Sequence, residues 1–333
     1  MTSGISQACP FGYRILGPVS GTRRWVVAAA AFAGYARCDP KAECDREAYL
    51  SAFCFGDDIR PRFDGTGSVD TKGYNGLCWA PWVWWDIDRD GNLESALSDV
   101  RALATVIQER FRVCGDELLV FFSGHKGFHL GLSTTLWSPE PSQLFHRVTR
   151  RFAEAVADLA SVTIDTAIYD KVRAFRAPNS RHPKSGLHKR RFALDELSSI
   201  SVEQIMSVAK QPMPFELAVA AQHGKQAAAD WIDATQHVDQ TEAHIRRRAE
   251  AADASPHLNR LTLEFITEGA IEGERNRRLF AAAANLAEFG CPSQLAHALL
   301  TPAALDSGLP PAEVRRQILR GLEHCAKGND CRG

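Results

Sequence analysis

The stretch WVWWDIDRDG, residues 82–91, places two carboxylates at the end of an apolar run. Successive side chains of a β-strand point to opposite faces, so Asp86 and Asp88 are expected to project side by side from one face. Two like charges this close are costly unless a positive charge lies between them. The stretch therefore predicts a buried strand that ends in a cation-binding pair of carboxylates.

The segments that follow this strand predict a split βαβ fold. Asn92 is a suitable N-cap for a helix in which apolar residues recur with helical spacing. The expected elements are a helix at 93–113, strands at 117–123 and 128–133, a second helix at 138–160 and a fourth strand at 161–165. The order β-α-β-β-α-β is that of ferredoxin-like and RNA-recognition-motif folds. The predicted fold class is therefore α+β.

Composition and chain length predict a soluble globular protein with one large domain or two smaller ones. The 333 residues are 45% hydrophobic and 24% charged, which suits a chain that builds a sizeable core. The net charge of −1 means that any nucleic-acid surface must be a local basic patch. The predicted strands end near Phe192, and the chain after this residue is expected to be helical. We expect a catalytic domain at 1–195 with an N-terminal α/β extension, a helical linker at 196–256 and a small all-α domain at 257–333.

Cysteine usage and the N-terminal apolar run indicate in which cellular compartment the protein is expected. Nine cysteines without CxxC pairs suit reduced thiols in the cytoplasm and argue against a structural zinc ion, although spacing alone does not decide whether Cys38, Cys44 and Cys54 bind a metal. Residues 21–38 look like a twin-arginine export signal, or like a buried Ala-rich helix followed by a loop. The run is too short to span a bilayer, so we expect the helix and no membrane partner.

The turn in FFSGHKGFHLGL, residues 121–132, brings donors close to a ligand. Gly124 and Gly127 let the backbone approach, Lys126 is a point-charge phosphate binder, and Ser123 with nearby amides could form an anion-holding nest. Alternation puts the apolar residues of the returning strand on one face and leaves His129 on the other, free to meet a ligand. The alternative is a plain β-turn with incidental polar residues.

A basic loop without acids covers residues 171–191. Its prolines and its glycine would hold the cations in place, and such a loop beside carboxylate-bound metal suits a polyphosphate. A charge run is otherwise a solvated face. Asp165, at the end of the expected fourth strand, could supply a third carboxylate. The three features together describe phosphoryl chemistry assisted by Mg²⁺ or Mn²⁺, with a two-metal site expected.

Four motifs in order resemble the catalytic core of archaeo-eukaryotic primases, and bacterial, plasmid and phage primase-polymerases in particular. They are WWDID (84–88), SGHKGFH (123–129), TID (163–165) and RAFRAPNSRHPKSGL (173–187), within a resemblance that covers about residues 49–192. The resemblance implies that Asp86, Asp88 and Asp165 are catalytic metal ligands, with Asp170 as the alternative third acid. The nucleotide contacts that it implies are Ser123, Lys126, His129, Arg176, Ser180, His182 and Lys184.

The resemblance implies a template-dependent nucleotidyltransferase, a DNA primase or primase-polymerase active in plasmid or phage replication. Its partners would be single-stranded DNA template, a primer strand and ribo- or deoxynucleoside triphosphates, with a replicative helicase as a further candidate. Residues 257–333 resemble the helical domain that follows such cores, where residues 275–278 (RNRR) could contact template or initiating nucleotide, or be surface charge.

Two other functions remain open: a metal-dependent nuclease and a non-catalytic single-strand-binding module for replication initiation. The basic loop argues against the nuclease, because diester hydrolysis has no triphosphate to hold. Base stacking on a sheet would need displayed aromatic residues. Trp82, Trp84 and Trp85 occur in a continuous run and are more simply core.

Overall fold

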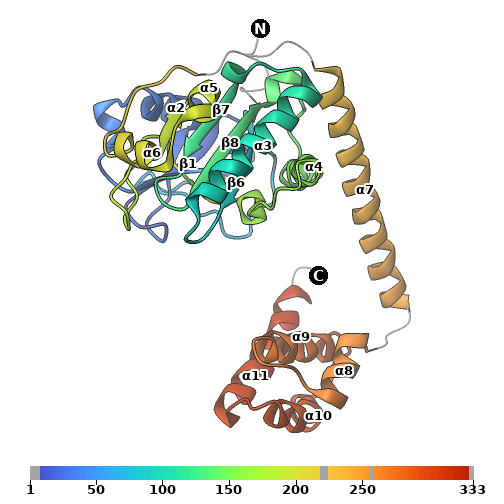
Figure 1. Cartoon of the computed structure of the whole chain (residues 1–333). Helices are drawn as coiled ribbons and strands as arrows, with labels where there is room; N and C mark the ends of the chain where they lie inside the picture. Colours follow the sequence, from blue (N-terminus) through green and yellow to red (C-terminus); the bar gives the residue numbers. More distant parts are fainter. Residues whose placement is uncertain (1–7, 218–223, 255–257, 330–333) are drawn as a thin grey trace. The chain divides into compact units, whose positions relative to one another are not determined.

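The computed structural model describes residues 8–217, 224–254 and 258–329. The chain divides into two compact units, Met1–Thr241 and Glu242–Gly333, and the boundary falls within the long helix α7 (Lys225–Ala254) (Figure 1). The sequence places its boundaries at 195/196 and 256/257 instead. Residues 196–241 belong to the first unit because this part of the chain packs on its core, where Ala227, Ala234 and Val238 of α7 are buried.

The first unit contains two β-sheets. One has the strand order β5-β4-β1-β3-β9, with β2 also paired to β1, and the other has the order β10-β7-β8-β6. The strands of the first sheet are β1 (Phe11–Leu16), β2 (Arg24–Val27), β3 (Ala48–Ser51), β4 (Cys54–Phe55), β5 (Cys78–Trp79) and β9 (Ala174–Arg176). Those of the second sheet are β6 (Trp82–Asp88), β7 (Leu118–Phe122), β8 (Gly127–Ser133) and β10 (Arg190–Phe192).

The first five predicted elements form in the predicted order. Strand β6 leads into α3 (Leu93–Phe111), then β7, β8 and α4 (Phe145–Leu159) follow. The Asn92 side chain caps α3, with its Oδ1 accepting the Ser95 N–H at 3.0 Å. Strand β6 pairs antiparallel with β8, which places Asp86 opposite His129. The fold is α+β with antiparallel sheets and a helical C-terminal region.

The predicted fourth strand at 161–165 does not form, so the split βαβ pattern is incomplete. Ser161 has a positive φ of 55°, and the segment makes one main-chain bond to β6, from the Asp165 N–H to the Asp86 carbonyl at 2.8 Å. The Thr163 carbonyl instead accepts from the Arg89 side chain at 2.9 Å. The fourth strand of this sheet is β10, which pairs with β7 at the opposite edge.

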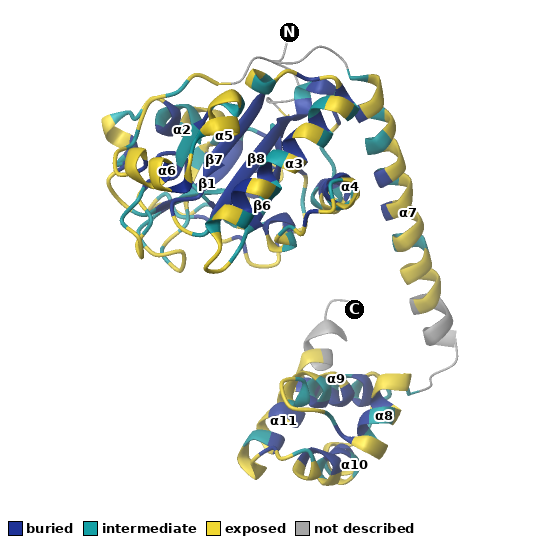
Figure 2. Ribbon diagram, in the orientation of Figure 1, coloured by how far each residue is buried: buried dark blue, intermediate teal, exposed yellow. Residues whose placement is uncertain are grey.

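Strand β6 separates two environments. Trp85 faces the helices, since its Nε1–H donates to the Ala153 carbonyl of α4 at 2.9 Å and its ring lies 6.5 Å from that of Phe152. The alternate residues on the other face, from Trp82 to Asp88, line pockets toward the first sheet. Figure 2 shows the central strands of this unit as buried. The acid pair therefore lies at one end of a face whose other end is aromatic.

The N-terminal apolar run forms a strand and a helix. Residues 24–27 are β2, and α2 (Ala28–Ala36) buries only Tyr35 and Ala36 fully, so the helix is less buried than the sequence predicts. The η helices, mostly short, are η1 (Pro40–Ala42), η2 (Asp57–Arg62), η3 (Gly115–Glu117), η4 (Thr134–Leu136) and η5 (Thr166–Tyr169). After β10 come α5 (Leu194–Ser199) and α6 (Val202–Val208). Across the described ranges, no helix is long and apolar enough to cross a membrane.

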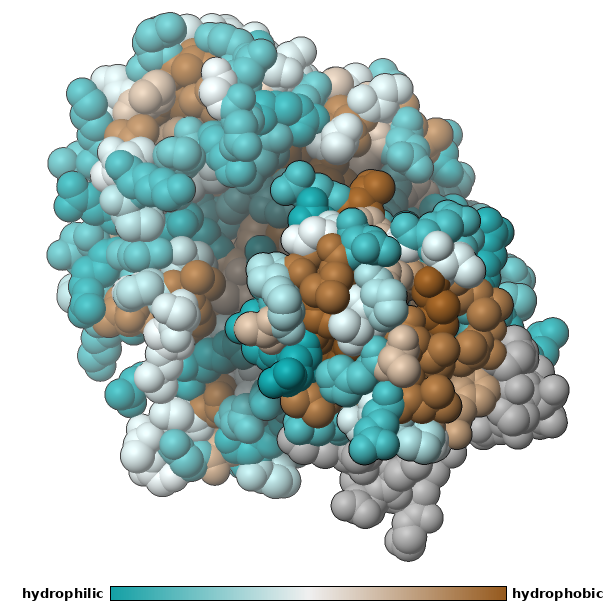
Figure 3. All heavy atoms as spheres, turned by 90° about the horizontal axis from the view of Figure 1, so that it is seen from below, coloured by the Kyte–Doolittle hydropathy of each residue, from teal (hydrophilic) through white to brown (hydrophobic). Residues whose placement is uncertain are grey.

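The second unit has its own core. It contains α8 (Arg260–Glu268), α9 (Arg275–Glu288), α10 (Ser293–Asp306) and α11 (Pro311–Asn329). Phe265, Leu279 and Ile318 are fully buried in it. Several large apolar side chains of this unit remain exposed, and the face in Figure 3 shows hydrophobic patches among hydrophilic side chains.

The arginines near the start of α9 are paired within this unit. Arg277 and Arg278 each lie 2.8 Å from a carboxylate oxygen of Glu274, and Arg275 lies 3.5 Å from Glu272. Both interpretations of residues 275–278, a contact with template or initiating nucleotide and surface charge, stay predictions.

Candidate active site

A pocket of about 220 Å³ gathers most of the predicted site residues. Those that line it are Asp86, Asp88, Ser123, Lys126, His129, Arg176 and His182. They come from β6, from the β7–β8 turn, from β8, from β9 and from the loop after β9. Tyr49, His125, Ile168, Arg173, Ala174 and Phe175 complete the lining.

The acid pair lies in this pocket with a histidine and a lysine beside it. His129 Nε2 is 3.4 Å from Asp86 Oδ1, and Lys126 Nζ is 3.2 Å from Asp88 Oδ2 and 3.0 Å from Asp90 Oδ1. Burial raises the pKa of Asp86, but His129, Lys189 and Lys126 outweigh it and hold this pKa below its usual value. Burial and the charges of Asp86 and Asp165 raise the pKa of Asp88, although Lys126 acts to lower it.

His129 lines the pocket, on the face that the sequence predicts, and is 5% exposed there. Its ring lies 4.4 Å from that of Phe175, which belongs to β9 of the other sheet. Burial and the charge of Lys189 lower the pKa of His129 to about 4, so the ring is neutral near pH 7. Asp86 Oδ1 has no hydrogen-bond partner within the described part of the chain, because the 3.4 Å contact with His129 lacks hydrogen-bond geometry.

The β7–β8 turn fits tightly against β6. The Ser123 N–H donates to the Gly127 carbonyl at 2.9 Å, and the Gly127 N–H donates to Ser123 Oγ at 3.3 Å. A Cβ at Gly127 would collide with the Ile87 carbonyl oxygen and lie 2.6 Å from Asp88 Oδ1. Glycine is therefore required at this position for the turn to approach the acid pair.

The basic loop closes onto this turn. The His125 and His182 rings stack with centroids 4.7 Å apart, and the Ser185 hydroxyl donates to the Gly124 carbonyl. The loop is closed by the His182 N–H, which donates to the Leu187 carbonyl at 2.7 Å. Burial and neighbouring cations, led by Arg176, lower the pKa of His182 to about 4.

Arg176 reaches the pocket from β9. Its Nη2 donates to Tyr49 Oη at 3.2 Å, and its guanidinium carbon lies 4.9 Å from the centre of the Tyr49 ring. Nη1 is buried and has no partner among the described residues. One guanidinium nitrogen thus remains available for an anion.

Three predicted site residues, Ser180, Lys184 and Asp165, do not line the pocket. Ser180 is buried, and its hydroxyl donates to the Ala177 and Ala48 carbonyls at 2.7 and 3.2 Å. Lys184 is exposed, and its main-chain N–H donates to Nδ1 of the lining residue His182 at 3.2 Å, so it lies near the pocket edge.

Asp165 is exposed and caps η5, with its Oδ1 accepting the Ala167 N–H at 2.8 Å. Its charge nevertheless contributes to the raised pKa of Asp88. The alternative acid, Asp170, acts instead on the pKa values of Tyr13 and His146. Asp165 is therefore the better placed of the two to act with Asp88.

Lys189 is the main site feature that the sequence does not single out. It is 1% exposed, and its Nζ donates to the Arg176 carbonyl at 2.9 Å. Nζ also lies 4.2 Å from the ring centre of Phe175 and 5.3 Å from that of Trp84. Lysines in a basic run look alike in sequence; the main chain of this one pairs with Asn179 and Ser180, through hydrogen bonds of 2.8 and 2.9 Å, just before β10 begins.

The predicted metal-binding groups are only partly assembled. Within the described residues, no set of three or more His, Cys, Asp or Glu side chains is arranged to hold a metal ion. Asp86 and Asp88 share the pocket, while Asp165 lies outside its lining. The three cysteines of the predicted cluster do not lie together: Cys38 and Cys44 belong to one small apolar cluster, whereas Cys54 is in the main core with Cys9 and Cys78.

Comparisons with known proteins add one remote likeness. No protein-family model matches the chain, and no curated protein matches it. Among solved structures, the crystal structure of primase RepB' is similar, with 14% sequence identity, a TM-score of 0.37, and coverage of 95% of this chain and 91% of that chain. A TM-score this low supports no argument about fold or function, so the proposal below rests on the pocket.

Proposed function

We propose that the chain is a template-dependent nucleotidyltransferase, a DNA primase or primase-polymerase that binds a nucleoside triphosphate in this pocket. One observation carries the proposal: the carboxylates of β6 line a single pocket together with the cationic side chains of Lys126, Arg173 and Arg176. Acids that can hold a divalent cation, next to cations that can hold phosphates, suit a metal-triphosphate substrate.

The acid side fits a divalent cation in its donor chemistry. Asp86 Oδ1 is a buried oxygen without a hydrogen-bond partner among the described residues, and like charges raise the pKa of Asp88. Oxygen donors of this kind suit Mg²⁺ or Mn²⁺. Asp86 and Asp88 would hold the ion, with Asp165 as the third acid. A bound ion would neutralise phosphate charge and favour ionisation of the attacking hydroxyl.

The cationic side fits the triphosphate. Arg176 has a free buried Nη1, and His182 lies beside it in the pocket lining. Lys184 would extend this wall at the pocket edge. In the reaction a 3′ hydroxyl attacks the α-phosphate, the bond to the β-phosphate breaks, and pyrophosphate leaves with its charge stabilised by Arg176 and Lys184.

Lys126 couples the two sides. Its ammonium group pairs with Asp88 and Asp90 in this structure. An ion bound at Asp88 would compete for the same oxygen, which would free Lys126 to contact a phosphate. Lys126 is 39% exposed at its side chain, so this exchange needs no rearrangement of the core.

Incubation of the full chain with labelled nucleotides and a single-stranded DNA template tests the proposal, with and without primer, in Mg²⁺ and in Mn²⁺. We expect a template-dependent polymer. Shortened template would instead indicate a nuclease, and template binding without any product would indicate a non-catalytic replication module.

A further inference from the structure

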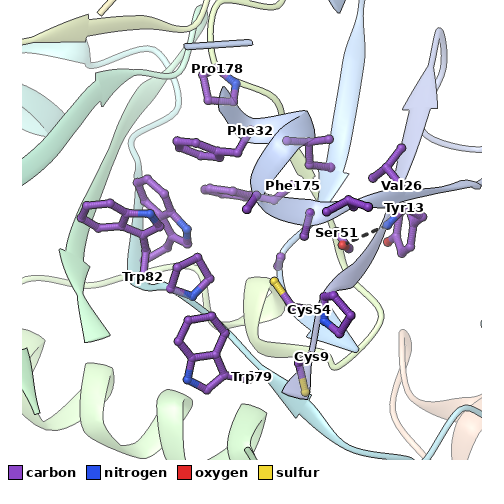
Figure 4. Close-up of a pocket in the computed structure, with 18 of the residues that line it drawn as sticks. Cys9, Tyr13, Val26, Phe32, Ser51, Cys54, Trp79, Trp82, Phe175 and Pro178 are labelled. Atoms are coloured by element: carbon purple, nitrogen blue, oxygen red, sulfur yellow. Dashed lines mark hydrogen bonds between the residues drawn. The ribbon is translucent and has the colours of Figure 1, made fainter. Parts of the chain in front are cut away.

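A second pocket, of about 320 Å³, lies on the same face of β6 as the acid pair, toward the Trp82 end of the strand. It is enclosed by β1, the β2–α2 connection, β3, β6 and β9. Figure 4 shows the rings of Phe32, Phe175, Trp79 and Trp82 near one another around it. Its volume is at the lower end of the roughly 300–1,000 Å³ that small-molecule pockets occupy.

Trp82, Trp84 and Phe175 form an aromatic wall of this pocket, and a glycine on the neighbouring strand makes room for the Trp84 ring. The Trp84 ring centre lies 6.1 Å from that of Trp82 and 5.6 Å from that of Phe175. Trp84 lies flat against β8 because residue 131 is glycine: a Cβ at Gly131 would lie 2.5 Å from Trp84 Cζ3. The glycine therefore keeps the ring against the sheet and the space in front of it open.

The polar groups of this pocket favour an anion. Arg176 and Lys189 are its only charged lining residues within the described chain, and no acid lines it. Lys189 donates to the Arg176 carbonyl at 2.9 Å, which leaves its remaining N–H groups directed among aromatic rings. An anion beside Nζ would also oppose the lowering of the Lys189 pKa by burial.

The same lining disfavours a nucleobase. Ser51 Oγ already accepts the Tyr13 N–H at 3.2 Å, and Thr135 Oγ1 lies in a 2.7 Å hydrogen bond with Ser133 Oγ. A base placed here would leave most of its hydrogen-bonding edge without partners, which is costly when buried.

We propose that this pocket is a second binding site, which takes a small flat aromatic anion of about the size of a substituted naphthalene. The aromatic body would lie among Trp82, Trp84 and Phe175, with the anionic group toward Lys189. The assignment does not depend on the proposed function. Because Phe175 and Arg176 line both pockets, an occupant of this site would contact the wall of the candidate active site.

The test measures the binding of 8-anilinonaphthalene-1-sulfonate to the full chain. The fluorescence of this probe reports its binding. N-phenyl-1-naphthylamine, which has the same rings without the sulfonate, is the matched neutral probe. We expect saturable binding of one sulfonate per chain, at least tenfold tighter than the neutral probe. Lys189→Met should remove that preference and leave binding of the neutral probe within about twofold, and unchanged near-ultraviolet circular dichroism would show that the variant is folded.

A pair of rim variants tests the location without touching Lys189. Ala29 lines the pocket and is exposed, whereas the adjacent Ala30 is exposed and does not line it. Ala29→Trp should weaken sulfonate binding at least tenfold, and Ala30→Trp should not. Equal binding of the two probes, several sulfonates per chain, or no effect of Ala29→Trp would overturn the proposal. Competition by adenosine 5′-monophosphate at lower concentration than the sulfonate would overturn the ligand class.

Discussion

The main-chain N–H of Asp165 donates a 2.8 Å hydrogen bond to the carbonyl oxygen of Asp86. This bond holds the third acid beside β6 although no fourth strand forms there. The side chain of Asp165 caps η5, and its charge reaches Asp88, whose pKa it helps to raise. Asp86 and Asp165 thus both act on Asp88 across a strand edge, while the acid pair alone lines the pocket.

Metal addition should stabilise the protein through Asp86 and Asp88. A ligand that binds only the folded state at 100 times its Kd contributes about 2.7 kcal/mol, so saturating Mn²⁺ should raise the Tm by several degrees. Asp86→Asn and Asp88→Asn should each remove most of this rise in a thermal-shift measurement.

Asp90→Asn is the matched control for the metal measurement. Asp90 also pairs with Lys126, but its side chain is 88% exposed and does not line the pocket. This variant should keep the Mn²⁺ response. Loss of the response in Asp90→Asn, together with its retention in Asp88→Asn, would move the metal site out of the pocket.

Arg176→Ala should weaken nucleotide use more than DNA binding. The change deletes a charge-assisted contact worth roughly 1.5–3 kcal/mol, so the nucleotide KM should rise about ten- to a hundredfold. Lys210→Ala is the control, because Lys210 is exposed and outside the pocket lining. Weaker binding of single-stranded DNA with a shallower salt dependence and an unchanged KM would show that Arg176 grips the nucleic-acid backbone instead.

Gly127→Ala should damage both stability and the acid pair. The added Cβ would meet the Ile87 carbonyl oxygen and Asp88 Oδ1, so β6 or the turn must shift, at a cost of about 1–3 kcal/mol in the free energy of unfolding. Gly34→Ala is the control, since a Cβ at Gly34 of α2 meets nothing within 4 Å and should stabilise the helix slightly. Urea unfolding measures both, and equal stabilities would contradict the close approach.

His146 should make the free energy of unfolding depend on pH. Burial, with Lys171 and Arg147 nearby, lowers its pKa from 6.5 to about 4 in the folded chain. The unfolded chain therefore binds more protons between these values, and the stabilisation present above pH 6.5 is lost as the pH falls toward 4. Allowing for partial exposure, His146 should account for roughly 1–2 kcal/mol of the loss between pH 7 and pH 5.

The control for this pH dependence is His146→Leu, measured by urea unfolding at both pH values. The variant should lose less stability than the wild type on acidification. Other buried histidines, such as His129, should still make the free energy of unfolding of the variant depend on pH. An identical pH dependence in the two proteins would show that His146 is not buried in its neutral form.

Local patterns in the sequence predict the parts of the fold that local interactions determine. Alternation along β6 places Asp86 and Asp88 on one face, and Asn92 caps the helix that follows, as the sequence indicates. The 161–165 segment shows the limit of such patterns. It has the composition of a strand, but the Arg89 side chain donates to the Thr163 carbonyl, a group that a strand would use for pairing. Residue propensities do not show such competition.

Long-range pairing explains what the sequence does not predict about the site. Tyr49 lies opposite Arg176 because β3 pairs with β9, across 127 positions of sequence. The same pairing brings Phe175 over His129 and covers a face that looks open when the second sheet is considered alone. Register between distant strands is set by the whole core and is not encoded in any one motif.

Template-dependent nucleotide incorporation by wild type, Asp86→Asn and Asp88→Asn, measured side by side, shows whether the pocket adds nucleotides through its acid pair. Each reaction contains labelled nucleotides, primed single-stranded DNA and saturating Mn²⁺, and near-ultraviolet circular dichroism verifies folding. We predict a growing polymer for the wild type and none for either variant, because each variant removes a carboxylate that would hold the ion at the triphosphate. Near-normal incorporation by either variant, or shortened DNA in place of polymer for the wild type, would contradict this prediction.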